Sequence, residues 1–378
     1  MACLAKILRR FACAWARAFR ARRRAPIAPA RRLRLLTALA LVATLGVGLV
    51  HVVRGPWIPD EDALRAGRLM LDGIRELGRM RHEIGEPIDP ILDPSGSGLI
   101  GIDYSDITTS LGDLPAKQTS LSPSFAGLVV KWLKEAGVRP GDRIAVTFSG
   151  SFPALNLAVL CAAETMRLDP YVISSVGASM YGANIYGFTW LDMEKRLADA
   201  GILHLRSRWA SLGGIMDTHG GVFETGIAEG EAAIARTGTP YLREGTPATV
   251  ERDALRRMDL YFAGGRPAAF VNVGGNVTAI GWINETHLLG NGLLRRFPAS
   301  DAPKRGLLFR MHERGVPVIH LLNIERLAAA NDLPIAPRSL EAQTDFEAVR
   351  RRQSQRLLLL LLAWGAAAVT GTAIRGLV

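Results

Sequence analysis

The chain has 378 residues, of which 46 are Lys or Arg and 35 are Asp or Glu, and its formal net charge at pH 7 is +11. A hydrophobic fraction of 48% excludes a disordered or collagen-like protein, and the length suits one large domain or two modest ones. Eleven basic residues precede Leu35, which leaves 35 basic residues against all 35 acidic ones in the remainder. The excess charge belongs to an N-terminal tail, so it does not indicate nucleic-acid binding.

Two apolar segments near the ends of the chain predict membrane helices. The first, 35–53, holds nineteen residues with only His51 ionisable, and the second, 357–374, holds eighteen residues without a charge. At 1.5 Å per residue, such lengths match a hydrocarbon core of ~30 Å. We therefore expect four parts: a basic cytoplasmic tail (1–34), a transmembrane helix (35–53), a soluble α/β domain (60–346) and a second transmembrane helix (357–374).

The basic tail also predicts the orientation. No small-x-small cleavage site follows Val53, which favours a signal anchor over a cleaved signal peptide. The positive-inside rule then keeps the tail in the cytoplasm and puts the central domain on the periplasmic side of the inner membrane. The arginines at 350–352 precede the second helix and oppose this topology, but they are outnumbered by the eleven basic residues of the tail.

The central region reads as alternating strands and helices. Residues 60–83 have helical spacing with Asp60 as N-cap, and the next apolar stretch, 98–104, predicts a strand. Further strands are expected at 143–148 and 171–176, and further apolar runs at 240–242, 268–273 and 316–321. Further helices are expected at 124–136, 152–167, 190–200, 227–236, 247–261 and 303–314. This alternation predicts a Rossmann-like, three-layer α/β fold with a largely parallel sheet and helices on both faces.

Small polar residues and glycines follow three of the expected strands. In an open α/β sheet, ligands bind beyond the carboxyl ends of the strands, and exposed backbone N–H groups at helix starts suit an anion. The candidate ligand-binding residues are therefore Ser149, Gly150, Ser151, Ser175, Gly177, Ser179, Asn272, Gly274, Gly275 and Asn276. The alternative is that these residues only form tight strand-to-helix turns. No P-loop or G-x-G-x-x-G motif is present, so no nucleotide cofactor is indicated.

A hydrolytic site is the other hypothesis. Ser151 and Ser179 are candidate nucleophiles, although neither stands in a complete G-x-S-x-G elbow. Asp217 and His219 stand two residues apart in a glycine-rich loop and could orient and supply a base. The remaining histidines show no metal-ligand spacing, so no metal is expected. Lys117 lies in a polar loop, where it could pair with an anionic ligand.

A further segment, Asn184–Glu194, is rich in polar and aromatic residues. Its Thr189 is a candidate N-cap, and Asp192 and Glu194 fall in the first helical turns that follow. Both helix capping and ligand contact fit this pattern.

Several blocks in one order resemble the poly-γ-glutamate system protein family, membrane-associated proteins of bacterial capsule gene clusters. The resemblance covers roughly 60–276. Its blocks are Tyr104–Gly112, Ala116–Lys117 with Thr119, Gly141–Arg143, Ser149–Pro153, Val176–Ser179, Gly182–Asn184, Thr189–Met193 and Ser211–Gly214. It implies a role beside the glutamate-polymerising ligase in making, exporting or retaining the polymer, and it supplies no active site.

Three functions are therefore expected from the sequence. The first is a membrane-anchored accessory protein whose α/β domain binds poly-γ-glutamate or an associated anion. The second is a serine-dependent hydrolase or transpeptidase acting on that polymer. The third is a non-catalytic scaffold that holds the synthase and export components at the membrane.

Overall fold

The computed structural model describes residues 59–214, 224–243, 250–281, 289–297 and 306–340. All of them belong to one compact unit of the chain, Trp57–Arg350. The other unit, Met1–Pro56 with Arg351–Val378, lies outside the described residues and contains both predicted membrane segments. Within the described part, no helix combines the length and the apolar character needed to cross a bilayer.

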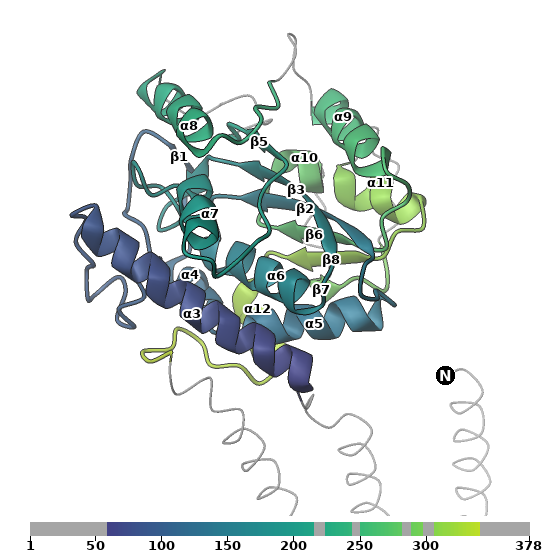
Figure 1. Cartoon of the computed structure of the whole chain (residues 1–378), viewed down its shortest axis with the longest axis horizontal. Coiled ribbons are helices and arrows are strands. Elements are labelled where there is room, and N and C mark those ends of the chain that lie inside the picture. Colours follow the sequence, from purple (N-terminus) through teal and green to yellow (C-terminus); the bar gives the residue numbers. More distant parts are fainter. Residues whose placement is uncertain (1–58, 215–223, 244–249, 282–288, 298–305, 341–378) are drawn as a thin grey trace, which may run out of the picture. The chain divides into compact units, whose positions relative to one another are not determined.

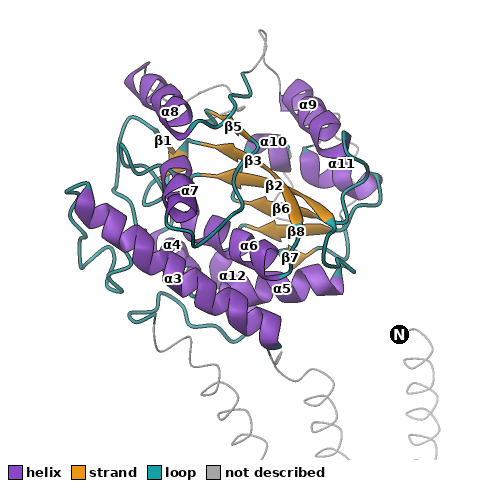
Figure 2. Ribbon diagram, in the orientation of Figure 1, coloured by secondary structure: helices purple, strands orange, loops and turns teal. Residues whose placement is uncertain are grey.

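The described residues form an α/β domain (Figures 1 and 2). Its helices are α3 (Glu61–Glu83), α4 (Leu114–Ser120), α5 (Ser124–Glu135), α6 (Pro153–Thr165), α7 (Trp190–Asp199), α8 (Glu224–Thr237), α9 (Val250–Phe262), α10 (Val277–Ile280), α11 (Leu307–Glu313) and α12 (Ile324–Ala330). Its strands are β1 (Thr108–Ser110), β2 (Arg143–Ser149), β3 (Asp169–Ser175), β4 (Ala178–Ser179), β5 (Trp209–Ser211), β6 (Phe270–Val273), β7 (Gly292–Leu293) and β8 (Val318–Leu321).

The main sheet is mostly parallel, with the strand order β5-β3-β2-β6-β8-β7. Only the edge pair β7–β8 is antiparallel. From β2 the chain adds β3 and β5 on one side, and then β6 and β8 on the other, so the strand order reverses between β2 and β6. In a doubly wound sheet, such a reversal leaves a crevice beyond the carboxyl ends of the two strands, where ligands bind.

Helices cover both faces of this sheet. Along β2, Ile144, Val146 and Phe148 belong to one buried cluster, which also takes in α3, α5, α6 and α7. Ala145, on the opposite face, belongs to a second cluster formed with α9 and α11. Strand residues alternate between faces, so a strand buried on both sides reads as a continuous apolar run. In Figure 1, α3, α5 and α6 lie on one side of the sheet, and α9 and α11 on the other.

Most of the predicted elements are confirmed. The helix predicted from Asp60 is α3, and the Asp60 carboxylate accepts a hydrogen bond from the Ala63 N–H at 3.0 Å. The strands predicted at 143–148 and 171–176 are β2 and β3. The apolar runs at 268–273 and 316–321 contain β6 and β8, whereas the run at 240–242 forms only an isolated bridge between Tyr241 and Ala210.

The strand predicted at 98–104 is wrong. Gly98 has φ +77°, a conformation that does not continue a strand. The backbone groups of this segment bond partly to side chains, since the Arg81 guanidinium donates to the Gly98 and Ile100 carbonyl oxygens and the Ile102 N–H donates to Asn184 Oδ1. The rest of its pairing is with Tyr181, whose carbonyl oxygen accepts from the Gly101 N–H and whose N–H donates to the Ile102 carbonyl oxygen, and Tyr181 is not part of a strand. The apolar residues are therefore buried without a partner strand.

Besides the six-stranded sheet, the domain has a second sheet of two strands, β1 and β4. β1 and β4 pair in parallel, with Thr108 opposite Ala178 and Ser110 opposite Ser179. The chain then turns from β1 into α4, whose N-cap is Asp113. This pairing brings Ser179 close to the helix that carries Lys117.

Candidate functional site

A cavity of about 520 Å³, the carboxyl-edge cavity, opens beyond the carboxyl ends of the parallel strands. Its walls come from the segments that follow β1, β2, β3, β5, β6 and β8. It is lined by Thr109–Asp113, Ala116, Lys117, Ser149, Ser151, Phe152, Ser175, Gly177, Ser179, Gly214, Gly275–Val277 and Leu322–Glu325. The cavity therefore lies at the reversal of strand order, where a doubly wound sheet binds its ligands.

Lys117 is the central residue of this cavity. It is only 2% exposed, and its Nζ lies 2.7 Å from Ser179 Oγ. The same Nζ donates a hydrogen bond to the Ser151 carbonyl oxygen and lies 3.8 Å from the centre of the Phe152 ring. The amine is thus held by contacts on three sides, with its lone pair or its third hydrogen directed at the Ser179 hydroxyl.

Burial lowers the pKa of Lys117 from 10.5 to about 7, because the charged ammonium loses its hydration. The negative charge of Asp113 partly opposes this and raises the pKa. At neutral pH a large fraction of Lys117 is therefore the free amine, which can accept a proton. A hydroxyl within hydrogen-bond distance of a neutral lysine is a nucleophile paired with its general base.

Local structure holds the two partners in place. The side chain of Asp113 accepts a hydrogen bond from the Ala116 N–H at 2.9 Å, which starts α4 one turn before Lys117. Ser179 is held by β1–β4 pairing and by its own N–H, which donates to Ser151 Oγ at 3.0 Å. Ser151 therefore stands beside Ser179 and keeps its hydroxyl hydrogen for donation.

Seven of the ten predicted ligand-binding residues line the cavity: Ser149, Ser151, Ser175, Gly177, Ser179, Gly275 and Asn276. Gly150, Asn272 and Gly274 are outside its lining. A Cβ at Gly150 would lie 2.5 Å from the Val176 carbonyl oxygen, and one at Gly274, which has φ +92°, would lie 2.4 Å from Ser149 Oγ. These two glycines allow the close approach of neighbouring segments.

Asn272 faces a neighbouring strand instead. Its Nδ2 donates to the Gly274 carbonyl oxygen and to His320 Nδ1, both at 2.8 Å. Burial lowers the pKa of His320 to about 4, so the imidazole is neutral and its Nδ1 can accept. Asn272 therefore connects β6 to β8.

Ser175 and Asn276 line the cavity but also hold its walls together. Ser175 Oγ donates to the Phe148 carbonyl oxygen at 3.1 Å and accepts from Asn276 Nδ2 at 3.4 Å. Asn276 Oδ1 caps α10 by accepting from the Thr278 N–H at 2.7 Å. Part of the hydrogen-bonding capacity predicted for a ligand is therefore used within the protein.

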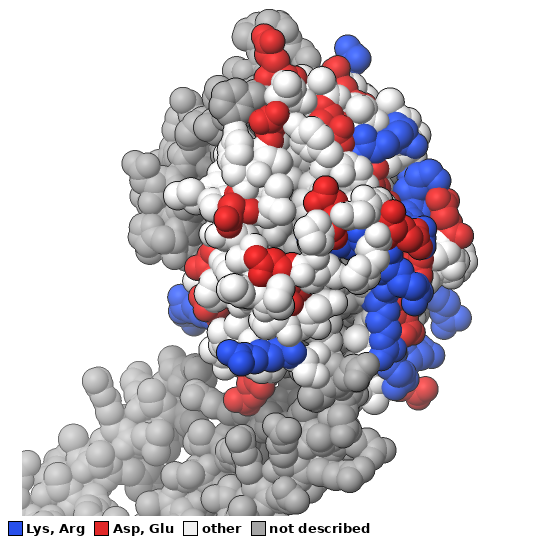
Figure 3. All heavy atoms as spheres, turned by 90° about the vertical axis from the view of Figure 1, so that its left-hand side faces the viewer, with Lys and Arg blue, Asp and Glu red and all other residues white. Residues whose placement is uncertain are grey.

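The charges on the cavity wall do not form an anion site. Its charged lining among the described residues consists of Asp113, Glu325 and Lys117. Over the surface drawn in Figure 3, basic side chains gather along one border, interspersed with acidic ones. A polyanion therefore gains little electrostatic attraction from the cavity itself.

The predicted triad partners Asp217 and His219 lie outside the described residues. Within the described ranges, no three His, Cys, Asp or Glu side chains come together in a way that could hold a metal ion. The described lining of the cavity offers serine hydroxyls, backbone groups, the Lys117 amine and the carboxylates of Asp113 and Glu325.

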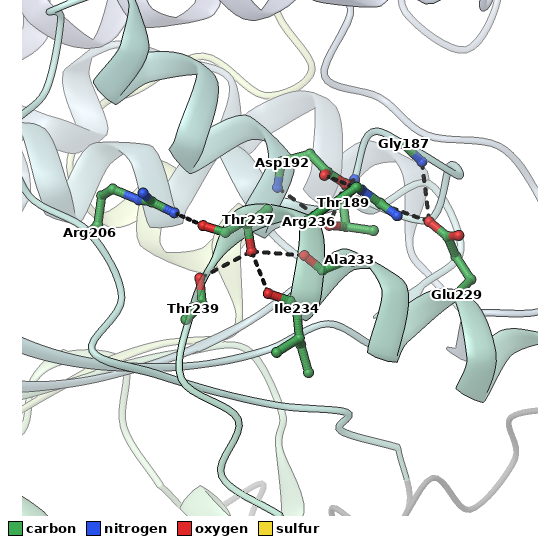
Figure 4. Close-up of polar contacts among 10 residues, drawn as sticks. All are labelled: Gly187, Thr189, Asp192, Arg206, Glu229, Ala233, Ile234, Arg236, Thr237 and Thr239. Atoms are coloured by element: carbon green, nitrogen blue, oxygen red, sulfur yellow. Dashed lines mark hydrogen bonds and ion pairs between the residues drawn. The ribbon is translucent and has the colours of Figure 1, made fainter.

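Thr189 and Asp192 form a structural cap. They make a capping box at the start of α7, and Asp192 also accepts hydrogen bonds from Arg236 of α8 at 2.7 and 2.8 Å (Figure 4). Arg236 continues to Glu229, whose carboxylate accepts from the Gly187 N–H. The capping interpretation of this segment is confirmed, and the network joins α7 to α8.

Glu194 is fully buried in the same helix, where Ser207 donates to it through both N–H and Oγ at 2.9 Å. Burial raises the pKa of Glu194 to about 7. Glu194 is not among the cavity residues.

The sequence predicts Lys117 in a polar loop, whereas it lies in the helix α4. Asp113 followed by Pro115 is the signal that was available, because an N-cap residue with proline in the first turn predicts a short helix. No local pattern reveals the contact between Lys117 and Ser179, which are 62 residues apart.

Comparison of this chain with protein-family models, with curated proteins and with solved structures gives no match. The functional argument therefore depends on the geometry of the cavity.

Proposed function

We propose that the protein is a membrane-anchored serine–lysine acyl-transfer enzyme that cleaves or transfers amide bonds of poly-γ-glutamate. The contact between Lys117 Nζ and Ser179 Oγ, 2.7 Å long and buried in the carboxyl-edge cavity, carries the proposal. Ser179 is the nucleophile, Lys117 its general base, and Ser151 a donor to the developing oxyanion.

In the first half-reaction, the neutral amine of Lys117 removes the proton of the Ser179 hydroxyl as Ser179 Oγ bonds to the amide carbonyl carbon. The carbonyl electrons move onto the oxygen, where the Ser151 hydroxyl can donate. The tetrahedral species then breaks its C–N bond, and the Lys117 ammonium gives its proton to the leaving nitrogen. The products are an acyl-Ser179 ester, a free amine and a neutral Lys117.

In the second half-reaction, water or an amine attacks the ester carbonyl and Lys117 takes its proton. The C–O bond to Ser179 breaks, and Lys117 returns the proton to Ser179 Oγ. Water yields hydrolysis and an amine yields transpeptidation. The same two residues therefore serve both outcomes, and the acceptor decides between them.

The choice of poly-γ-glutamate comes from the resemblance of the sequence blocks. Lys117, Ser151 and Ser179 each lie within one of those blocks, as do Gly177 and Gly214 of the cavity wall. The predicted membrane helices would hold this domain beside the polymer at the outer side of the inner membrane. The amide linkage of the polymer is a substrate for which a serine nucleophile with a lysine base is suited.

A serine-reactive fluorophosphonate tests the proposed pair directly on the full chain. We expect a single adduct on Ser179, located by mass spectrometry, and loss of labelling in S179A and K117M. The control is S122A, because Ser122 is a buried serine outside the cavity whose hydroxyl has no hydrogen-bond partner in the described part. Labelling of K117M at the wild-type rate, or an adduct on another serine, would refute the pair.

The second candidate is binding of the polymer without chemistry. The hydroxyl and amide lining of the cavity, with Ser149 and Ser151 at the end of β2 and Asn276 after β6, favours it. Incubation of the full chain with poly-γ-glutamate separates the two candidates. Shortened or transferred chains support the enzyme, whereas polymer that binds and stays intact supports the binding protein.

A further inference from the structure

A second hollow of about 520 Å³, the α3 hollow, lies between α3, the loop 95–97 and the segment 338–340. Its charged lining residues among the described positions are Arg75, Arg79 and Arg338, and none of the described residues that line it is an aspartate or a glutamate. The described lining of this hollow is therefore positively charged, unlike that of the carboxyl-edge cavity.

We infer that the α3 hollow is an exosite that binds a polycarboxylate chain through Arg75, Arg79 and Arg338. The choice of a glutamate chain as the ligand rests on the proposed function. The presence of an anion site rests on the hollow alone.

Two glycines, Gly78 and Gly98, allow the loop 95–97 to lie close to α3 beside the hollow. A Cβ at Gly98, where φ is +77°, would lie 2.9 Å from Gly78 Cα, and a Cβ at Gly78 would lie 3.0 Å from the Ser97 carbonyl oxygen. The loop can therefore approach α3 only because both residues lack side chains. Larger residues at these two positions would hold the loop away from the helix.

The loop wall is also fixed by a buried carboxylate. Asp93 is 2% exposed, and its oxygens accept hydrogen bonds from Ser95 Oγ at 2.7 Å, Ser97 Oγ at 2.8 Å and the Gly98 N–H at 2.7 Å. The wall is therefore held in one conformation within the protein.

Arg79 remains accessible to a ligand. It contacts Glu76, yet its side chain is 62% exposed. A guanidinium has five donors in a planar fork, so the Glu76 carboxylate does not use all the donors of Arg79. Glu76 is additionally paired with Arg196 at 2.6 Å, which shares its negative charge with a residue outside the hollow.

The spacing of the cations suits a chain better than a single ion. Arg75 and Arg79 stand at positions i and i+4 of one helix, so they are separated by about 6 Å along the axis of α3. Arg338 approaches from a different segment. A ligand with carboxylates repeated along its length can reach several of these cations at once.

One segment of the chain contributes to the lining of both the carboxyl-edge cavity and the α3 hollow. The segment 322–340 begins in the lining of the carboxyl-edge cavity and ends in that of the α3 hollow. Between them, the Ala336 N–H donates to Thr119 Oγ1 of α4 at 2.9 Å, and Gln118 of α4 donates to the Leu92 carbonyl oxygen at 2.8 Å. The helix that carries Lys117 thus contacts the two segments that lead into the lining of the α3 hollow.

The test is a binding measurement on the full chain in neutral detergent, in the S179A background so that no turnover occurs. The probe is a fluorescent γ-linked oligoglutamate, and inorganic phosphate and phosphatidylglycerol vesicles are the comparison ligands. We expect R79E/R338E to weaken oligoglutamate binding by about tenfold or more, with R79Q/R338Q showing a smaller loss and serving if the charge reversals fail to fold.

The matched control is R65E/R208E, which reverses two exposed arginines outside the hollow and changes the net charge equally. Wild-type affinity in both hollow variants, or an equal loss in the control, would overturn the exosite. Vesicle binding that depends on Arg79 and Arg338 without oligoglutamate binding would also overturn it and assign the hollow to a lipid headgroup. Oligoglutamate binding at the hollow with no reactive Ser179 would leave the exosite standing and refute the proposed enzyme.

Discussion

The carboxyl-edge cavity and the α3 hollow have the same volume, about 520 Å³, and their cations differ in burial. Lys117 in the cavity is 2% exposed, and burial brings its pKa to about 7. The Arg79 side chain in the hollow is 62% exposed, and a guanidinium stays charged at any physiological pH. We therefore propose different roles for the two residues, with Lys117 as a general base and Arg79 as a group that binds an anion.

The largest effect is expected when the proposed nucleophile in the carboxyl-edge cavity, Ser179, is replaced. S179A should lower the rate of poly-γ-glutamate cleavage or transfer by roughly 10³-fold or more, because no other group replaces Ser179 Oγ. The release of shortened or transferred chains measures it, and S122A is the matched control. Full activity in S179A would place the chemistry elsewhere.

The pH dependence of the rate follows from Lys117. Only the neutral amine accepts the Ser179 proton, so kcat/KM should rise with pH through about 7 and level off above it. Below the pKa the loss approaches tenfold per pH unit, which rates measured with an uncharged ester can follow. A rate that stays constant down to pH 5 would contradict a lysine base.

The stability of the fold should depend on pH through the same residue. The folded pKa of about 7 lies below the value of 10.5 expected for an exposed lysine, so the unfolded chain binds more protons between these pH values. The free energy of unfolding should therefore rise from pH 7 to 10.5, by up to roughly 5 kcal/mol.

K117M should lack this rise and should be the more stable protein at pH 6. Urea unfolding at several pH values measures the difference. K195M is the control, because the Lys195 side chain is 40% exposed. A rise of the same size in K117M would show that Lys117 is not its source.

A smaller effect is expected beside the α3 hollow, where Gly98 lies close to Gly78. G98A should cost about 2–3 kcal/mol, because the new Cβ meets Gly78 Cα at 2.9 Å in addition to the strain of φ +77°. G96A has φ +65° but no atom within 4 Å of the new Cβ, so it should cost only about 1 kcal/mol. Equal losses in urea unfolding would mean that the close approach is unimportant.

The smallest effect concerns ionic strength, to which the carboxyl-edge cavity and the α3 hollow should respond differently. Oligoglutamate binding at exposed arginines should weaken severalfold between low and physiological salt, because surface charges are screened. The rate of Ser179 labelling by an uncharged fluorophosphonate should change little, since Lys117 is buried. Equal salt dependence of both measurements would remove the distinction.

The sequence predicted the long helices and the central strands of this fold well. Continuous apolar runs in β2 and β3, and the Asp60 cap of α3, are local signals with one interpretation. The error at 98–104 arose because apolar residues can be buried by a guanidinium and an asparagine side chain as well as by a partner strand. The short elements β1, β4 and α10 hold too few residues to show a period.

For the candidate site, the sequence pointed to the edge of the sheet at which the carboxyl-edge cavity lies. The polar residues after β2, β3 and β6 were predicted because the carboxyl ends of parallel strands converge. It did not separate Ser149, which lines the cavity, from Asn272, which joins β6 to β8. That distinction depends on which way each side chain faces after the strands pair.

By itself, the sequence determined the α/β class, the polar and glycine-rich character of the sheet edge and the separation of a basic tail from a formally neutral remainder. Hydrophobic period, caps and charge counts are local quantities, so they can be read without coordinates. Only the tertiary structure decided that Lys117 is buried against Ser179 and that Arg338 joins the arginines of α3. Desolvation and contact between residues distant in the chain exist only once the chain has folded, and they lower the pKa of Lys117 to about 7.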